Sequence, residues 1–240
     1  MLKNILKIIV FFVVGMAGGI FSDQILWPYF VERPLFYQYK LDQNPIEVTE
    51  IREITVRENE ALTSAIEKVE SVIVGIKSQT SNNNFLEGSG LIVTSDGFVV
   101  VLMDFAPKYA TSTVFIDGKS LPLRLLKQDS KTGLALLKVE SNNLPTVGFA
   151  DFGRLKLGQR VFLVGADFKS STSSIEKMVS EGIVQKFSSL AIETSMSEGN
   201  EAKGSILFNV SGEVLGINEI NSKGKVIAIP VSKIKEIAGM

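Results

Sequence analysis

The sequence predicts an all-β domain, built as a sandwich or a pair of barrels, that follows an N-terminal membrane helix. Beyond residue 71 the chain is a series of short apolar runs separated by turn residues, which is the pattern of strands in sandwiches and barrels. Before residue 28, one continuous apolar run is long enough to span a bilayer. A third observation limits the function, because the 240 residues include no histidine and no cysteine.

Residues 1–27 are predicted to form a transmembrane signal-anchor helix. The stretch from Ile5 to Trp27 supplies the roughly 20 residues that a spanning helix needs. Lys3 and Lys7 precede the apolar run and Asp23 follows it. The positive-inside bias therefore predicts a single-pass protein with a cytoplasmic N-terminus and an extracytoplasmic domain.

Two alternatives for this segment stay open. Gly15-Met16-Ala17 is a passable cleavage site for a signal peptide, which would be removed on secretion. A core helix of a soluble protein is the other alternative. Whether the segment is an anchor or a signal peptide, the domain is expected outside the cytoplasm. If it is an anchor, the membrane is one of the protein's partners.

Residues 28–58 are predicted to form an extended juxtamembrane stalk. Prolines at positions 28, 34 and 45 argue against a long helix. The aromatic residues between them argue against a flexible linker, which would be rich in glycine and serine. Residues 51–57 have the composition of a short strand.

The folded domain is predicted over residues 59–240. It opens with a helix over about 60–69, preceded by Asn59 as N-cap, and it closes with a short helix over 232–238, capped by Ser232. Ser95-Asp96-Gly97 lies between two apolar runs and predicts a β-hairpin. The predicted strands are 71–78, 91–93, 98–101, 113–116, 134–139, 161–164, 182–186, 190–193, 206–208, 214–217 and 226–229.

Composition excludes several kinds of partner and cofactor. Lysine plus arginine (25) nearly balance aspartate plus glutamate (26), so the net charge is −1 and no nucleic-acid partner is expected. Without cysteine the chain forms no disulfide and no thiolate metal site. Without histidine as well, a transition-metal site is not expected, and the sequence predicts no cofactor.

An ordered set of motifs between Gly88 and Asn218 resembles serine proteases of the HtrA (DegP-like) family, which have the chymotrypsin fold. The motifs are Gly88-Ser89-Gly90-Leu91-Ile92-Val93, Asp129-Ser130-Lys131-Thr132-Gly133-Leu134-Ala135-Leu136-Leu137, Leu157-Gly158-Gln159-Arg160-Val161, Ser180-Glu181-Gly182-Ile183-Val184 and Gly212-Glu213-Val214-Leu215-Gly216-Ile217-Asn218. The resemblance implies two six-stranded β-barrels with the active cleft between them. The family usually carries a C-terminal PDZ domain, and we expect none in this chain.

The resemblance also implies that all three catalytic positions are replaced. The family's histidine falls at Asp104, its catalytic aspartate at Gly133 and its nucleophilic serine at Lys203. The glycine that helps shape the oxyanion hole falls at Glu201. Losing the nucleophile or the base alone costs roughly 10⁶ in turnover. We therefore expect a pseudoprotease and no enzyme.

Two other catalytic arrangements could use the same residues, and each has a simpler structural explanation. A Ser–Lys dyad would pair Lys203 with one of three serines, Ser195, Ser197 or Ser205. Asp104 would act as a base only with a raised pKa, and with Glu201 it would form a carboxylate pair. A solvated loop lysine and a strand-end aspartate explain the same residues without chemistry.

The expected function is a membrane-anchored, extracytoplasmic module that binds peptide or protein. A cleft of this fold binds extended peptide by strand addition, which needs no triad. The candidate cleft residues are Met103, Glu201, Ala202, Lys203, Gly204 and Ser205. Two alternatives are a serine endopeptidase with relocated catalytic residues and a purely structural membrane protein whose cleft is closed by Met103, Phe105 and Met196. The partner and the oligomeric state stay open.

Overall fold

The structure is a computed structural model that describes residues 2–26, 60–116, 118–168 and 175–240. Internal contacts divide the chain into two units, Met1–Thr55 and Val56–Met240. The predicted stalk, the possible strand over 51–57 and the Asn59 cap lie outside the described residues.

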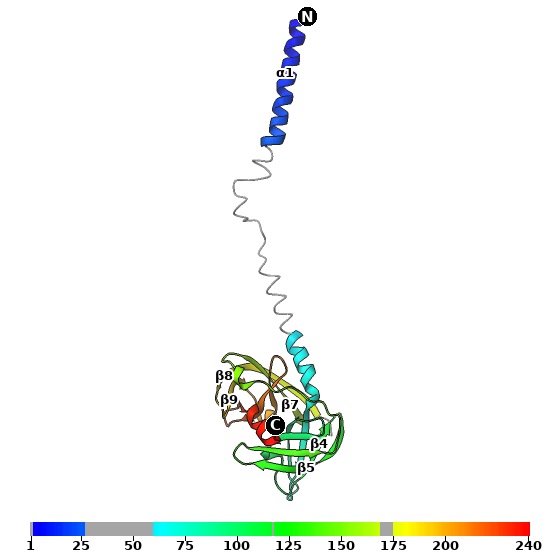
Figure 1. The fold of residues 1–240 in the computed structure, drawn as a ribbon, viewed down its shortest axis with the longest axis vertical. Coiled ribbons are helices and arrows are strands. Elements are labelled where there is room, and N and C mark those ends of the chain that lie inside the picture. Colours follow the sequence, from blue (N-terminus) through cyan, green and yellow to red (C-terminus); the bar gives the residue numbers. More distant parts are fainter. Residues whose placement is uncertain (1, 27–59, 117, 169–174) are drawn as a thin grey trace. The chain divides into compact units, whose positions relative to one another are not determined.

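The first unit contains an apolar helix, as predicted. Helix α1 (Leu2–Phe21) continues into a π-helical turn, η1 (Ser22–Leu26) (Figure 1). The stretch Lys3–Ile25 has 23 residues, and an 18-residue window within it has a mean hydropathy of 2.3, so it is long and apolar enough to cross a membrane. Its described side chains are exposed, and Phe11 reaches 81%. Exposed apolar surface of this extent is typical of a segment that lies in lipid or against a partner.

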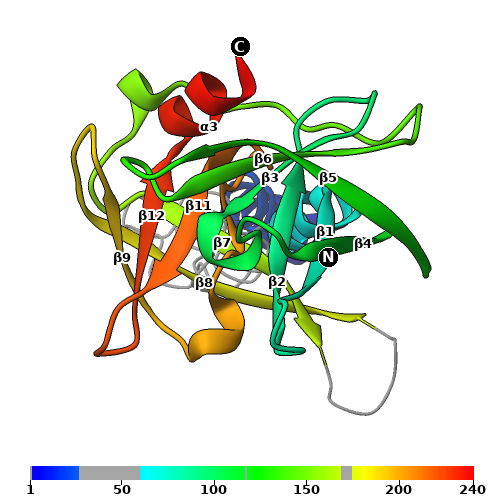
Figure 2. The same cartoon turned by 90° about the horizontal axis from the view of Figure 1, so that it is seen from below.

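The second unit consists of two closed six-stranded barrels, as the resemblance implied (Figures 1 and 2). The N-terminal barrel has the order β1-β2-β3-β6-β5-β4. Its strands are β1 (Ile73–Gln79), β2 (Phe85–Ile92), β3 (Phe98–Leu102), β4 (Thr111–Ile116), β5 (Lys119–Asp129) and β6 (Leu134–Val139).

The C-terminal barrel repeats this topology, in the order β7-β8-β9-β12-β11-β10. Its strands are β7 (Arg160–Phe168), β8 (Ile175–Phe187), β9 (Ile192–Ser197), β10 (Ile206–Asn209), β11 (Val214–Ile220) and β12 (Lys225–Pro230). Since the sequence has no repeat at a fixed period, the symmetry of the two barrels lies in their backbones and not in their residues.

The strand predictions are confirmed in place where apolar runs are continuous, and they fail where polar residues interrupt them. Strands β2 and β8 begin at Phe85 and Ile175, well before the predicted 91–93 and 182–186, and β1 begins at Ile73 and not at residue 71. The hairpin at Ser95-Asp96-Gly97 joins β2 and β3, and Gly97 has a φ of +104°. Strand β5 was missed because its core residues Leu121, Leu123 and Leu125 alternate with the exposed Pro122 and Arg124. That alternation is itself a strand signal for a sheet with one solvated face.

The strand predicted over 190–193 is wrong in its boundaries. Strand β9 begins only at Ile192, because the preceding residues form the turn after β8. The N–H of Ser188 donates to the carbonyl of Ala191 at 2.8 Å across this turn. Leu190 therefore lies at the turn with 76% of its surface exposed.

The predicted helix over 60–69 is confirmed. Its apolar side packs Ala65 and Val69 against the barrels. A 3-10 turn, η4 (Glu70–Val72), then leads into β1. Lys68 Nζ donates to the carbonyl of Ser211 at 3.2 Å, which joins the helix to the C-terminal barrel.

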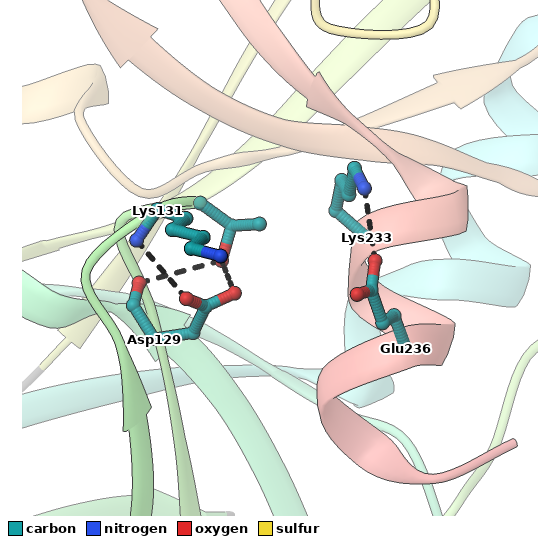
Figure 3. Close-up of polar contacts among 5 residues, drawn as sticks. Asp129, Lys131, Lys233 and Glu236 are labelled. Atoms are coloured by element: carbon teal, nitrogen blue, oxygen red, sulfur yellow. Dashed lines mark hydrogen bonds and ion pairs between the residues drawn. The ribbon is translucent and has the colours of Figure 1, made fainter.

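The C-terminal helix α3 (Val231–Ala238) is confirmed, but the Ser232 cap is wrong. The N-cap position is Pro230, and no side chain caps the helix. The helix starts one residue early because Val231 is buried with Ile234 and Ile237 on its inner side. An ion pair at 2.9 Å between Lys233 and Glu236 lies along the helix (Figure 3).

Three apolar cores hold the domain together. One fills the N-terminal barrel and one fills the C-terminal barrel. The third lies between the barrels and includes residues of both helices. At its centre Phe162 and Phe208 stack with ring centroids 5.4 Å apart. Buried area of this kind is the main stabilising term, so the two barrels form one packed body.

Candidate functional site

Asp104 lies in a short 3-10 turn, η5 (Met103–Phe105), directly after β3. The N–H of Met103 donates to the carbonyl of Gly133 at 2.7 Å, and Ser78 Oγ donates to the carbonyl of Phe105 at 2.5 Å. Phe105 is 8% exposed and anchors the turn in the core. The Asp104 side chain, in contrast, is 61% exposed at the surface.

Gly133 ends a tight turn that begins at Asp129 (Figure 3). Asp129 Oδ2 accepts from the Thr132 hydroxyl at 2.8 Å, and Asp129 Oδ1 accepts from the Lys131 N–H at 3.0 Å. These hydrogen bonds, the hydroxyl's first, lower the pKa of Asp129 below its usual value. The turn closes with Gly133 at a φ of +72°, which glycine adopts without strain.

Lys203 follows the 3-10 turn η7 (Asn200–Ala202) in the C-terminal barrel. Its Nζ lies 2.5 Å from Oδ2 of Asp104, and its side chain is 29% exposed. The pair therefore joins the two barrels at the surface. The residues at the predicted base and nucleophile positions thus form an ion pair. Gly133, at the predicted aspartate position, is hydrogen-bonded to Met103, which precedes Asp104.

The loop over residues 199–205 uses its own N–H groups internally. Lys203 N–H donates to the carbonyl of Asn200 at 3.0 Å, and Ala202 N–H donates to that of Gly199 at 3.1 Å. An oxyanion hole requires backbone N–H groups, including that of the nucleophile position, directed at the substrate. Here the N–H at that position already has an acceptor within the loop.

Three other predicted site residues differ in exposure. Glu201 is exposed, whereas Ala202 and Ser205 are fully buried. Ser205 Oγ accepts from Asn218 Nδ2 at 2.9 Å, so this hydroxyl points into the domain. The structure therefore places Ser205, one of the three serines considered for a dyad, in the interior, while Lys203 is engaged with Asp104. Ser195 Oγ accepts from the Ile183 N–H at 3.0 Å.

Gly204 allows the loop to pack closely on the N-terminal barrel. It has a φ of +83°, and a Cβ built on it would lie 2.8 Å from the Phe105 ring and 3.0 Å from the carbonyl oxygen of Ser89. Gly204 N–H also donates to the carbonyl of Asn218 at 2.8 Å. The loop is thus fixed by backbone contacts on both sides.

The residues expected to close the cleft lie in different places. Phe105 packs beside Gly204, and Met196 belongs to the core of the C-terminal barrel. Met103 is half-buried and borders a hollow of about 630 Å³ on the side of the N-terminal barrel. Asp104 lines this hollow, whereas Lys203 does not.

Sequence reasoning missed Glu219 on β11. Its Oε1 lies 3.6 Å from the position that a Cβ on Gly133 would occupy. A carboxylate of the C-terminal barrel therefore approaches the position where the family's aspartate would stand. No sequence signal connects residues 133 and 219, since only the packing of the two barrels brings them together.

The site offers no group of metal ligands. Across the residues that the structure describes, no cluster of three or more acidic, histidine or cysteine side chains is placed to hold a metal ion. What the arrangement provides is an ion pair, fixed loops and the adjacent hollow.

The comparisons with known proteins agree with the double barrel. The family model described as a trypsin-like peptidase domain matches residues 82–217. A probable periplasmic serine endoprotease DegP-like of Halomonas elongata is 32% identical over 163 residues, which are 63% of this chain and 34% of that protein. A protein of the same description from Pseudomonas putida (strain W619) is 35% identical over 140 residues, covering 55% of this chain and 28% of the relative.

A third relative of this description, from Rhizobium meliloti, is 32% identical over 166 residues, covering 63% of this chain and 32% of its own. The chain thus spans about a third of the length of these relatives. The family-model match over residues 82–217 includes the loops that carry residues 104, 133 and 203.

Proposed function

Because the chain belongs to the trypsin-like peptidase domain family, we propose that it is a pseudoprotease that binds a peptide or protein without cleaving it. The observation that carries this proposal is the ion pair between Lys203 and Asp104 at 2.5 Å. At the two positions where the family resemblance places nucleophile and base, an ammonium faces a carboxylate. A lysine held by a carboxylate donates its protons and does not act as a base toward a serine.

The hydrogen bonds of the 199–205 loop support the same proposal. The Lys203 N–H has Asn200 as its acceptor, so stabilisation of an oxyanion would require this bond to break. Rebuilding the side chains of a triad would therefore leave the loop unsuited to the transition state.

The proposed location is the extracytoplasmic side of a membrane. The relatives are named periplasmic, and the N-terminal helix is long and apolar enough to anchor the domain. Lys3 and Lys7 at its start favour a cytoplasmic N-terminus. Cleavage within the helix would instead release the domain.

The test uses the full chain in lipid nanodiscs, a fluorophosphonate probe and unfolded casein. We expect no labelling and no cleavage. Labelling that disappears in Ser205→Ala or Ser195→Ala would overturn the proposal and favour an enzyme with relocated residues. The triple variant Asp104→His, Gly133→Asp, Lys203→Ser is expected to stay unlabelled as well, because the loop keeps its internal hydrogen bonds.

A structural role without any ligand is the second candidate. The close packing of Gly204 against Phe105 and Ser89 favours it, since this loop leaves no space between the barrels at that point. Peptide binding separates the two candidates, because a purely structural domain would bind none.

A further inference from the structure

The hollow beside Asp104 is a groove between the 103–108 segment and the end of β5. We call it the Leu126 groove. Its lining residues are Met103, Asp104, Pro107, Lys108, Leu125, Leu126, Lys127, Gln128 and Ser130. Gln128 Nε2 donates to the carbonyl of Ala106 at 2.6 Å and joins the two walls. The groove is therefore a fixed feature of the N-terminal barrel.

A β-bulge directs Leu126 into this groove. The register between β5 and β6 shifts between Leu125 and Lys127, so Leu126 is the extra residue. Its neighbours Leu123 and Leu125 pack on the barrel core, but Leu126 is 42% exposed. Bulges beside functional sites commonly re-aim a side chain in this way.

The opposite wall ends in a strained residue. Tyr109, next to Lys108, has a φ of +69° and is 94% exposed. A left-handed conformation costs a bulky residue free energy, and the structure offers this ring no packing in return. Irregular backbone thus exposes Leu126 within the groove and Tyr109 just beyond its lining residues.

The charge of the groove is positive. Lys108 and Lys127 are exposed, and within the described part of the chain no ion pair of 4.0 Å or less involves either. Lys127 interacts electrostatically with the carboxylate of Asp129, which does not line the groove. The only carboxylate that lines the groove is that of Asp104, which is paired with Lys203. Two ammonium groups therefore flank an apolar floor.

We propose that the Leu126 groove binds an extended segment of a partner protein in which acidic residues alternate with apolar ones. This rests on the proposed binding function and gives it a place and a ligand chemistry. Apolar side chains of the segment enter between Met103, Pro107 and Leu126, and its carboxylates meet Lys108 and Lys127.

The shape of the groove favours a peptide over a lipid surface. A membrane surface is met by apolar side chains that protrude. Met103, Pro107 and Leu125 are instead half-buried within a concave wall, which suits side chains that insert from outside.

The test measures fluorescence anisotropy of labelled decapeptides with the full chain in phosphatidylcholine nanodiscs. One peptide alternates glutamate and leucine, the second has lysine in place of glutamate, and the third has serine. We expect saturable binding of the acidic peptide, at least about tenfold tighter than that of the lysine peptide. The Lys108→Glu, Lys127→Glu double variant is expected to lose this preference, and Leu126→Ser is expected to weaken binding of the acidic peptide severalfold.

The matched control is Lys156→Glu, Lys223→Glu, the same charge change at exposed positions of the C-terminal barrel, and it is expected to bind like the wild type. Two results would contradict the groove as the peptide-binding site. One is a preference for the acidic peptide that persists in the Lys108→Glu, Lys127→Glu variant, and the other is failure of all three peptides to bind. Equal binding of the three peptides also overturns it but leaves a binding function in place. Fluorophosphonate labelling is measured separately. Labelling would contradict the proposed lack of catalysis, but it would leave the proposed peptide site in the groove untouched.

One further measurement distinguishes lipid from peptide. Amide exchange over residues 103–110 is compared in nanodiscs with and without phosphatidylserine, in the absence of peptide. We expect no difference. Slower exchange with the anionic lipid, together with no peptide binding, would assign the patch to the membrane surface and overturn the proposal.

Discussion

The turn over residues 129–133 and the loop over residues 199–205 contribute to the same site but are held in different ways. Both segments have internal hydrogen bonds. In the first turn Asp129 accepts from Lys131 and Thr132 within a few residues, and the long-range bond is that from the Met103 N–H to the Gly133 carbonyl. The second is fixed by distant parts of the chain, because Gly204 packs on Phe105 and Ser89 of the other barrel. Local bonds specify a turn shape, and long-range packing specifies where a loop lies.

Under the proposed loss of catalysis, the two segments differ in what has changed. The 129–133 turn keeps the motif that resembles the family, with Gly133 at the position where the resemblance places an aspartate. The loop held by long-range contacts carries Glu201 and Lys203, and the latter is paired across the barrels with Asp104. On this proposal residues 104 and 203 act together, because their ion pair stands where the family resemblance places a base and a nucleophile.

The largest expected difference in stability between the two segments comes from replacing the glycine of each by alanine. Both have positive φ, +83° at Gly204 and +72° at Gly133, so alanine is strained at both. The added Cβ would lie 2.8 Å from the Phe105 ring at residue 204, but 3.6 Å from its nearest neighbour at residue 133. We expect the free energy of unfolding to fall by about 3 kcal/mol for Gly204→Ala and by about 1 kcal/mol for Gly133→Ala.

Urea unfolding of the full chain in detergent, followed by circular dichroism, measures both losses. Equal losses would contradict the view that packing, and not backbone conformation alone, holds the 199–205 loop.

The Asp104–Lys203 ion pair should contribute less to stability. With side chains 61% and 29% exposed it is largely screened by solvent, and exposed pairs contribute below about 1 kcal/mol. A double-mutant cycle with Asp104→Asn and Lys203→Met is expected to give a coupling free energy in that range, and smaller at high salt. A coupling of several kcal/mol would mean that the pair itself holds the barrels together.

The smallest effect concerns the pH dependence of the 129–133 turn. The pKa of Asp129 is lowered in the folded state, chiefly by the Thr132 hydroxyl. Its stabilisation is therefore complete above the unfolded value and is lost as the pH falls through the lower folded pKa. Thr132→Val should destabilise slightly near neutral pH, and the difference from the wild type should vanish well below about pH 4.

Amide exchange at Lys131, measured across this pH range, tests the acid dependence of the turn. A difference between Thr132→Val and the wild type that stays constant down to the lowest pH would show that the hydroxyl acts through packing and not through the carboxylate.

Much of the fold followed from local patterns. The hairpin at Ser95-Asp96-Gly97 and the helix over 60–69 were predicted because turn residues and apolar spacing act over a few residues. The cap at Ser232 was predicted wrongly, because the helix begins at the buried Val231 and its N-cap position is Pro230. Strand β5 was missed because alternating residues give a weaker signal than a continuous run.

The site was only partly predictable. The family motifs assigned Asp104, Gly133 and Lys203 to triad positions and so implied that they lie near one another, but the ion pair between Lys203 and Asp104 came only from the structure. The approach of Glu219 to Gly133 depends on how the two barrels pack, since the residues lie in separate barrels. The bulge at Leu126 depends on the register of β5 with β6.

By itself the sequence determined the apolar N-terminal helix, the β-barrel domain and the lack of histidine, because composition and short-range periodicity carry that information. The tertiary structure alone decided that the ammonium of Lys203 meets the carboxylate of Asp104 and that a positively charged groove opens beside them. Both depend on contacts between segments far apart in the chain, and such contacts are fixed by the packing of the whole domain and not by any one segment.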